Sequence, residues 1–248
     1  MIGATRFLRD RIDAKEQLRG LSCAFGEPQI AEEFAMAGFD YVYVDQQHGH
    51  VTQERLLQMM RAITPTDTAA LVRVAENQPA LIGAALDAGA EGVIVPDVED
   101  AGAAARAVRA CKYAPLGSRS WGPMRAVHGV GVDPAVVNSR TVCLVMIESK
   151  AAVEAIDEIL DVPGIDGVYI GPADLSVSLG GEPKSLSQNP DERTLAAIKT
   201  IRDACVIRGK IAAVSGRPSE LHKEGYAMVT AASDYTLIRS GLQSLQAD

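Results

Sequence analysis

Two acidic residues, Glu148 and Asp174, stand where a sequence of this kind could do chemistry. Each follows a short apolar segment that is typical of a buried strand, Val145–Ile147 before Glu148 and Val168–Ile170 before Asp174. A parallel α/β fold collects the carboxyl ends of its strands on one face, so the two carboxylates are expected to lie together there. Carboxylate oxygens suit hard divalent cations such as Mg²⁺ or Mn²⁺. The pair predicts metal-dependent chemistry on a small oxygenated substrate.

Three further polar residues fall at predicted strand ends. Asp45 closes one strand, His48 lies in the loop after it, and Arg73 lies near the end of the next strand. A neutral imidazole can accept a proton near physiological pH, and Asp45 could orient it, so His48 is the expected general base. Arg73 can grip a carboxylate or an oxyanion with two parallel hydrogen bonds. An ion pair of Arg73 with Asp45 or Glu148 is the structural alternative.

Apolar, Val- and Ile-rich segments alternate with helical patterns along the whole chain. The expected strands are Gly20–Phe25, Asp40–Asp45, Ala69–Val74, Gly92–Pro96, Thr141–Glu148, Gly167–Gly171, Lys210–Ser215 and Ala227–Ser233. The expected helices between and after them are Pro28–Ala37, Thr52–Ile63, Pro79–Ala88, Glu99–Cys111, Ala151–Leu160, Asp191–Ile207, Ser219–Glu224 and Tyr235–Gln246.

Eight such strands predict a closed parallel (β/α)₈ TIM barrel, formed as a single domain over residues 1–248. An open doubly wound sheet would show similar segments, and the length alone would also allow two smaller domains. Two stretches, Tyr113–Val132 and Leu179–Asp191, are rich in Gly and Pro and are expected to be long loops with a functional or interface role. The final helix carries an apolar stripe that must pack on its own barrel or on a neighbouring one, namely Leu237, Ile238, Leu242 and Leu245.

Composition excludes several classes of function. With 24 basic against 32 acidic residues the net charge is −8, which disfavours nucleic-acid or membrane-surface binding. No apolar segment is long enough for a membrane span and no secretory signal is evident, so a cytoplasmic location is expected. The four scattered cysteines are expected to be buried, reduced thiols. A nucleophile elbow, a phosphate-binding P-loop, a dinucleotide fingerprint and a suitably placed Schiff-base lysine are missing from the sequence.

Several motifs, in their order and spacing, resemble the HpcH/HpaI aldolase family, class II pyruvate aldolases on a (β/α)₈ barrel. They are "AGFDYVYVDQQHG", "LVRV", "LDAGAEGVIVPDVED", "YAPLGSRSWG", "MIES" and "DVPGIDGVYIGPADLSVSLG", and together they span nearly the whole chain. The last of these is highly specific.

The resemblance implies reversible retro-aldol cleavage of a 4-hydroxy-2-oxo acid to pyruvate, or hydroxypyruvate, and an aldehyde through a metal-stabilised enolate. Glu148 and Asp174 would hold a divalent cation (Mg²⁺, Mn²⁺ or Co²⁺). Arg73 would bind the developing enolate oxygen, and His48, paired with Asp45, would move the proton of the aldehyde oxygen.

The resemblance also implies features outside the metal pair. Gly171, Pro172 and Ala173 would line the 2-oxo acid pocket together with Asp174. Asp87 would reach the site of a neighbouring subunit, and the chain would form a homohexamer, a trimer of dimers, with its final helix exchanged between barrels.

Three residues depart from the family's commoner pattern, and they leave the choice of substrate open. Gln47, Met146 and Ser22 stand where Glu, Gln and Trp occur in relatives. The acceptor aldehyde and the choice between pyruvate and hydroxypyruvate are therefore not predicted. A carbon–carbon lyase acting on acyl-CoA thioesters, or a barrel that binds a 2-oxo acid without turning it over, are the alternative functions.

Overall fold

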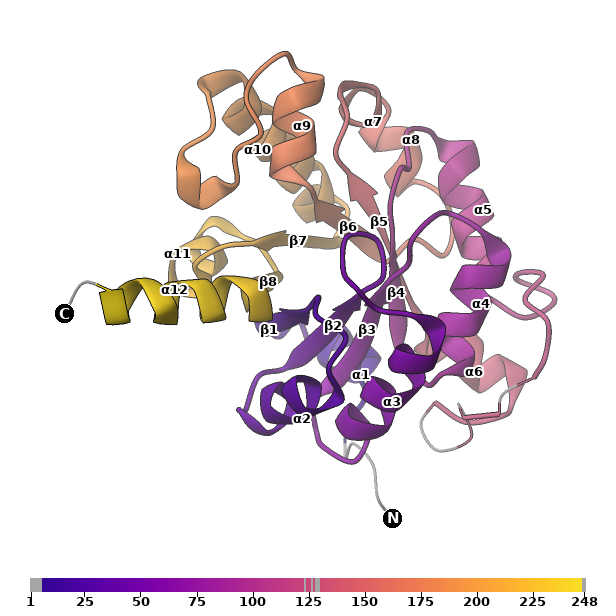
Figure 1. Ribbon diagram of the computed structural model, residues 1–248. Coiled ribbons are helices and arrows are strands. Elements are labelled where there is room, and N and C mark those ends of the chain that lie inside the picture. The colour runs from indigo at the N-terminus through magenta and orange to yellow at the C-terminus, as the bar shows by residue number, and fades with distance from the viewer. Residues whose placement is uncertain (1–5, 123, 126, 128–129, 247–248) are drawn as a thin grey trace.

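The computed structural model describes residues 6–122, 124–125, 127 and 130–246. Its eight strands form a closed, all-parallel barrel in chain order, surrounded by helices (Figure 1). This confirms the predicted (β/α)₈ architecture. The strands are β1 (Leu18–Cys23), β2 (Tyr41–Asp45), β3 (Ala69–Arg73), β4 (Gly92–Val95), β5 (Val142–Ile147), β6 (Gly167–Ile170), β7 (Ile211–Ser215) and β8 (Met228–Ser233).

The helices also follow the expected pattern, with differences at particular places. They are α1 (Leu8–Asp13), α2 (Pro28–Met36), α3 (Gln53–Ile63), α4 (Pro79–Asp87), α5 (Ala101–Cys111), α6 (Pro134–Arg140), α7 (Lys150–Glu154), α8 (Ile156–Leu160), α9 (Pro172–Ser178), α10 (Glu192–Ile207), α11 (Pro218–Leu221) and α12 (Asp234–Gln246), with short 3₁₀ helices η2 (Leu186–Gln188) and η3 (His222–Glu224).

Local sequence signals explain where most of these helices begin. The side chains of Thr52, Asp100 and Asp191 accept hydrogen bonds from backbone N–H groups in the first turns of α3, α5 and α10. Such caps satisfy donors that a helix start leaves unpaired. A proline occupies the first turn of α2, α4, α6, α9 and α11, where its missing N–H costs nothing.

Three helices were not expected from the sequence, and one expected helix is broken. α1, α6 and α9 are short, so their apolar periodicity is too brief to recognise. The expected helix Ala151–Leu160 is divided into α7 and α8 at Ala155, whose backbone (φ −96°, ψ 11°) departs from helical geometry. α9 matters most, because it begins directly after the expected strand Gly167–Gly171 and carries Asp174 in its first turn.

Each strand buries both of its faces, as parallel strands covered by helices do. Tyr41, Tyr43 and Leu71 belong to the cluster that fills the barrel interior, and the alternating Val42 and Val72 belong to the cluster between strands and helices. The fit inside the barrel is close: a Cβ at Gly20 would lie 2.2 Å from the Tyr41 ring. The four cysteines are buried and free, as predicted.

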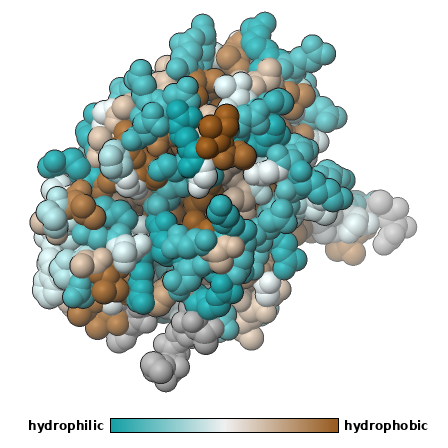
Figure 2. Space-filling view, turned by 180° about the vertical axis from the view of Figure 1, so that it is seen from behind, coloured by the Kyte–Doolittle hydropathy of each residue, from teal (hydrophilic) through white to brown (hydrophobic). Residues whose placement is uncertain are grey.

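None of the helices in the described residues has the length and apolar character needed to cross a membrane. The face seen from behind is largely hydrophilic, with small, separate apolar patches (Figure 2). The stretch Tyr113–Val132 has no α-helix or strand in its described part, as expected for a long loop.

Helix α1 closes the end of the barrel where the strands begin, and a buried carboxyl group holds it there. Leu8 is fully buried in the interior cluster, and its backbone N–H donates to Glu91 Oε2 at 2.6 Å. Burial raises the pKa of Glu91 to about 7, an effect that the hydrogen bond from Leu8 only partly opposes. The folded protein therefore keeps a proton on Glu91 that the unfolded chain loses at lower pH.

We expect Glu91 to make stability fall as pH rises from about 4.5 to 7. The folded pKa lies above the unfolded one, so the unfolded state ionises first and is favoured through this window, by an amount on the order of 3 kcal/mol. Glu91→Gln keeps an acceptor for Leu8 but cannot ionise, so it should flatten the dependence. Urea unfolding of both proteins between pH 4.5 and 8 measures this, and parallel curves would contradict it.

Candidate active site

Asp45 and Arg73 form an ion pair at the mouth of the barrel. They are register partners at the carboxyl ends of β2 and β3. Arg73 donates from Nε to Asp45 Oδ1 at 2.8 Å and from Nη2 to Oδ2 at 2.6 Å, and both side chains are largely buried. Burial works to lower the pKa of Arg73, but the hydrogen bonds and charge of Asp45 outweigh it and raise that pKa. The Arg73 guanidinium therefore stays charged. Its partner is Asp45, one of the two ion-pair partners that the sequence allowed as the structural alternative.

The observed hydrogen bonds of Asp45 go to Arg73 and to the backbone of the loop after β2. The resemblance paired Asp45 with the His48 imidazole, but Asp45 Oδ1 accepts the backbone N–H groups of Gln47 (3.0 Å) and His48 (3.3 Å). Asp45 thus holds the backbone of the loop that carries His48 and the guanidinium of Arg73, and its pairing with the His48 imidazole stays a prediction. The register that places Arg73 beside Asp45 is the physical reason for their ion pair, because a fork of two N–H donors satisfies a carboxylate best.

Arg73 keeps donor capacity after this pairing. Its Nη1 lies 3.9 Å from the sulfur of Met146, which is a weak acceptor. The guanidinium carbon lies 5.9 Å from the centre of the Tyr43 ring, so an aromatic face supports the cation from one side. The arrangement leaves a fixed, charged donor available to an oxyanion at the mouth.

Glu148 directly follows β5, and Asp174 lies in α9, which begins just after the adjacent strand β6; both line one cavity at the same mouth, as predicted. β5 and β6 pair in register at Ile147 and Ile170, and Glu148 and Gly171 follow directly. A Cβ at Gly171 would lie 2.9 Å from Glu148 Cβ, so glycine lets the chain pass close to Glu148 directly after β6. Asp174 lies in the first turn of α9, where a negative charge is favoured.

These two carboxylates repel each other in a partly dry environment. Burial raises the pKa of Glu148, the nearby charge of Asp174 raises it further, and a hydrogen bond from the Asp97 backbone N–H (3.1 Å) opposes the shift. Among the described residues, neither acid forms an ion pair with Lys or Arg. A bound divalent cation would remove this repulsion, so the donor set fits one.

The described residues contain no cluster of three or more His, Cys, Asp or Glu side chains placed to hold a metal ion. The protein would therefore supply two carboxylates, and other oxygen ligands would have to complete the coordination of a cation. An incomplete protein shell is what a catalytic, rather than a structural, metal site requires.

Two cavities adjoin at the mouth, and His48 lines both of them. The smaller cavity, of about 250 Å³, contains Glu148 and Asp174. The larger one, of about 950 Å³, contains Asp45 and Arg73. The exposed His48 thus stands between the acid pair and the ion pair, where an imidazole can reach a group that extends from one cavity into the other.

Other predicted residues lie elsewhere or are not placed in the cavities. Gly171, Pro172 and Ala173 are not among the described residues that line either cavity, so their role in a 2-oxo acid pocket stays a prediction. Asp87 ends α4 and pairs with Arg119 at 2.5 Å.

The arginines of the long loop have structural partners within the chain. Arg119 is almost fully buried and lies over the Tyr113 ring at 4.7 Å in addition to its pairing with Asp87. Arg125 donates to Thr64 Oγ1 at 2.5 Å and to the Ala88 carbonyl at 3.2 Å. These intramolecular contacts account for the positions of both arginine side chains, so no substrate contact is needed to explain them.

The sequence reasoning missed the contribution of the β4 end. Asp97 has a left-handed backbone (φ 56°), which directs its N–H to Glu148. Asp97, Glu99, Gln47 and Ser149 line the smaller cavity with the two predicted metal ligands. The signal was present as the acids of "VPDVED", three in number, which directly follow an apolar strand, the same pattern that drew attention to Glu148.

Comparison with known proteins supports this arrangement. Residues 20–240 match the HpcH/HpaI aldolase/citrate lyase family. The 2-keto-3-deoxy-L-rhamnonate aldolase of Salmonella schwarzengrund (strain CVM19633) is 38% identical over 183 residues, which are 72% of this chain and 66% of that protein. The chain thus spans slightly under two thirds of the curated relatives that it matches.

Solved structures agree over almost the full chain. A HpcH/HpaI aldolase/citrate lyase family protein from Burkholderia cenocepacia J2315 superposes with a TM-score of 0.87 at 28% identity, covering 97% of this chain and 98% of that one. The HpcH/HpaI aldolase from Desulfitobacterium hafniense DCB-2 has a TM-score of 0.85 at 27% identity, covering 97% and 96%. The barrel described here belongs to the HpcH/HpaI aldolase/citrate lyase family.

Proposed function

We propose that this protein is a metal-dependent carbon–carbon lyase, an aldehyde-lyase that reversibly cleaves a 4-hydroxy-2-oxo acid to pyruvate, or hydroxypyruvate, and an aldehyde. The single observation that carries the proposal is that two carboxylates, Glu148 and Asp174, line one cavity at the mouth of an aldolase-family barrel, beside a second cavity that contains the fixed Arg73 and shares His48 with the first. Aldol cleavage needs both an electron sink and a stabilised oxyanion, and these groups provide for both.

Glu148 and Asp174 would hold the divalent cation, Mg²⁺, Mn²⁺ or Co²⁺. When bound, the cation supplies Lewis acidity that stabilises the negative charge developing on a 2-oxo acid. Asp174 and the backbone of Gly171–Ala173 would then border the three-carbon acid, since α9 starts beside Glu148. The smaller cavity has room for a donor of that size.

The remaining residues would direct charge and protons. Arg73 would donate from Nη1 to the enolate oxygen while Nε and Nη2 stay on Asp45, so that the guanidinium does not reorient during the reaction. His48 would take the proton from the C4 hydroxyl in cleavage and return it to the aldehyde oxygen in synthesis, because it borders both cavities. Asp45 would act by positioning Arg73 and the His48 loop.

A second candidate is cleavage of an acyl-CoA thioester of the malyl-CoA or citryl-CoA type. The family includes citrate lyases, and the larger cavity of about 950 Å³ exceeds the volume that a short aldehyde needs. Supplying both kinds of substrate to the same preparation separates the two candidates. Only the acyl-CoA lyase would release an acyl-CoA product.

Deuterium exchange at C3 of pyruvate in D₂O tests the proposal without any knowledge of the acceptor. NMR should show exchange with Mg²⁺, Mn²⁺ or Co²⁺, loss of exchange with EDTA, and recovery on adding the metal back. Aldehyde release from 4-hydroxy-2-oxo acids should follow the same metal dependence. Saturable binding of pyruvate without exchange would indicate the binding barrel instead, and would refute the lyase.

We also propose that the chain forms a homo-oligomer, a hexamer in which α12 packs against a neighbouring barrel. α12 projects from the barrel edge (Figure 1), and its apolar residues Leu237, Ile238, Leu242 and Leu245 are about half exposed or more. An apolar stripe without a partner favours association. In such an assembly, Asp87, which lies at the opposite end of its own strands, could approach the mouth of another subunit.

Charge placed on this stripe should dissociate the oligomer. Leu242→Glu combined with Leu245→Glu leaves the barrel of one chain untouched, because both side chains are 56% and 73% exposed in it. We expect the mass in size-exclusion chromatography with light scattering to shift toward the monomer. Gln243→Glu adds charge to the same helix without removing apolar surface and should keep the parental mass. An unchanged mass in the double variant would contradict the proposal.

A further inference from the structure

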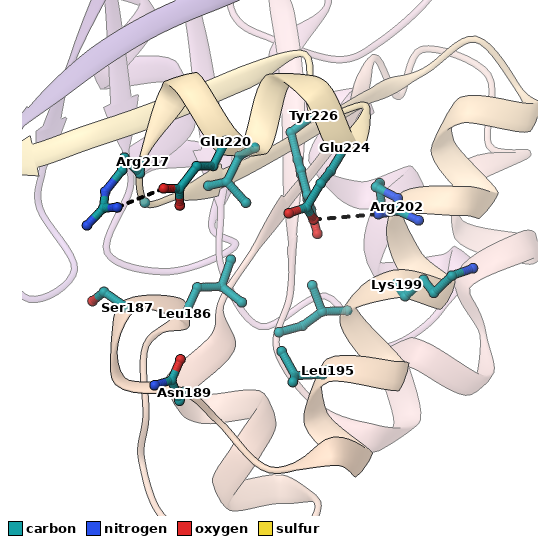
Figure 3. A pocket seen from close by; sticks show the side chains of 13 residues that line it. Leu186, Ser187, Asn189, Leu195, Lys199, Arg202, Arg217, Glu220, Glu224 and Tyr226 are labelled. Atoms are coloured by element: carbon teal, nitrogen blue, oxygen red, sulfur yellow. Dashed lines mark hydrogen bonds and ion pairs between the residues drawn. The ribbon is translucent and has the colours of Figure 1, made fainter.

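A pocket of about 530 Å³ lies between α10, the loop that contains η2, and α11 with η3 (Figure 3). This space, here called the side pocket, shares Ser187, Gly216 and Arg217 with the larger cavity at the mouth, but its other described lining residues border neither cavity there. Its volume lies in the range of about 300–1,000 Å³ in which proteins hold small ligands. The side pocket is therefore a separate space that the proposed lyase reaction does not use.

The middle of the side pocket is apolar. Its walls there are Leu195 and Ile198 on α10, Leu221 on α11, Leu186 in η2, and the ring of Tyr226. Ile198, Leu221 and Tyr226 are buried, whereas Leu195 keeps 44% of its surface exposed. An apolar group of a ligand would cover this surface and remove it from water, which favours binding.

Two ion pairs lie at opposite ends of the side pocket (Figure 3). At one end Arg217 lies 2.7 Å from Glu220, with the two side chains 74% and 59% exposed. At the other end the Nη1 atom of Arg202 lies 3.8 Å from Glu224 Oε2. Apart from Lys199, these four are the charged side chains among the described residues that line the pocket. A ligand that enters the pocket therefore meets both signs of charge at either end.

Arg202 is held in place by the protein itself. Its Nε and Nη2 donate to Asp203 Oδ1 at 2.9 and 2.6 Å, and its guanidinium carbon lies 5.9 Å from the centre of the Tyr226 ring. Nη1, by contrast, forms no hydrogen bond within the described residues, since 3.8 Å to Glu224 is too long for one. A carboxylate can therefore bind Nη1 without displacing Asp203.

Glu224 decides which carboxylates fit beside Arg202. Its side chain is 55% exposed, and its one ion-pair partner among the described residues is Arg202. A ligand that carries a carboxylate alone would place two negative charges together next to one arginine, which is unfavourable. A ligand that carries an ammonium beside its carboxylate gives each protein charge a partner of opposite sign. An α-amino acid has these two groups on one carbon atom, so its charges match the Arg202–Glu224 pair.

We infer that the side pocket binds an α-amino acid with a branched aliphatic or aromatic side chain. Arg202 Nη1 donates to its carboxylate, Glu224 accepts from its ammonium, and its side chain lies against Leu195 and the buried apolar residues of the pocket. The inference goes beyond the proposed lyase function and does not depend on it, since neither Arg202 nor Glu224 lines a cavity at the mouth.

Calorimetric titration of the full chain with L-leucine and L-phenylalanine tests this inference. Both should bind saturably at a single site, and glycine, which lacks the apolar group, should not. Two probes each remove one charge of leucine, because 4-methylpentanoate has no ammonium and 3-methylbutylamine has no carboxylate. Each should bind roughly ten- to hundredfold more weakly than leucine, as expected for a lost hydrogen bond between charged groups.

Saturating pyruvate with Mg²⁺ separates the side pocket from the mouth. Leucine binding should persist in their presence, because the residues that hold the two charges of leucine do not line the cavities of the proposed active site. Displacement of leucine by pyruvate would instead place the amino acid at the mouth and overturn the inference.

Two variants assign the charges of leucine to their partners. Arg202→Gln should abolish saturable binding, and the fold should tolerate it because Asp203 is 40% exposed and keeps its pairing with Lys199 at 2.5 Å. Glu224→Gln should weaken leucine roughly tenfold or more but strengthen 4-methylpentanoate, because the charge that repels a lone carboxylate is gone. A variant that only damaged the pocket would weaken both ligands.

Lys199→Gln is the matched control, because it removes a positive charge from the same helix and pocket, while the Lys199 side chain points away from the space between the elements (Figure 3). It should leave the affinity for leucine unchanged. Three results would overturn the inference: no saturable binding of leucine or phenylalanine, equal affinities for leucine and either glycine or 4-methylpentanoate, or a Glu224→Gln variant that binds leucine as wild type does.

Discussion

Glu148→Gln and Asp174→Asn should each abolish metal binding and lower kcat/KM for retro-aldol cleavage by roughly a thousandfold or more, the scale of a lost Lewis acid. Each substitution removes one of the two carboxylates that the protein offers to the cation, and the described residues near them provide no third carboxylate or imidazole in a ligating cluster. Calorimetric titration with Mn²⁺ measures the affinity for the metal separately from turnover.

In contrast to activity, the stability of the metal-free protein should not fall when Glu148 is replaced by Gln. Burial and the charge of Asp174 raise the pKa of Glu148, which means that the ionised group is unfavourable in the metal-free fold. Glu148→Gln keeps an acceptor for the Asp97 N–H, so metal-free protein should melt at the same or a higher temperature, without the increase that Mn²⁺ gives wild type.

Glu99→Gln is the control for these variants, because Glu99 is exposed and lines the same cavity without lying at a β5 or β6 strand end. It should retain metal binding and most activity. Full turnover by a Glu148→Gln/Asp174→Asn double variant that binds no metal would refute the assignment of this pair.

Arg73→Leu should lower turnover by roughly a hundred- to a thousandfold and also destabilise the fold. The activity loss is that of a missing oxyanion donor. The stability loss arises because Asp45, which is 5% exposed, would keep a charge without its partner, at a cost of about 3–5 kcal/mol. Metal affinity should change much less than kcat, since Arg73 is not among the residues that line the acid cavity.

A double variant separates the two effects. Asp45→Asn combined with Arg73→Leu removes the unpaired charge and should recover part of the lost stability, but not the activity. Arg73→Lys keeps a positive charge without the fork that Asp45 needs, so it should recover stability only partly. If Arg73→Leu reduced metal affinity as strongly as turnover, Arg73 would have to be reassigned to the metal site.

The barrel was predictable because its signals are local and repeated. Each strand is a short apolar segment rich in Val and Ile, and caps or N-terminal prolines mark most helices, so errors at single boundaries did not change the count of eight. Short helices such as α1, α6 and α9 carry too few residues for a period to appear. The contribution of Asp97 was also missed, since its left-handed backbone follows from tertiary packing.

By itself the sequence determined the (β/α)₈ fold and that Asp45, Arg73, Glu148 and Asp174 come to one mouth, because parallel strands bring their carboxyl ends to one face whatever the surrounding loops do. Which of those side chains contact each other was decided only by the tertiary structure. Strand register placed Arg73 beside Asp45, where the sequence allowed Asp45 to pair with His48. Register also placed Gly171 against Glu148. Register depends on how eight strands close around one shared interior, and no single segment encodes it.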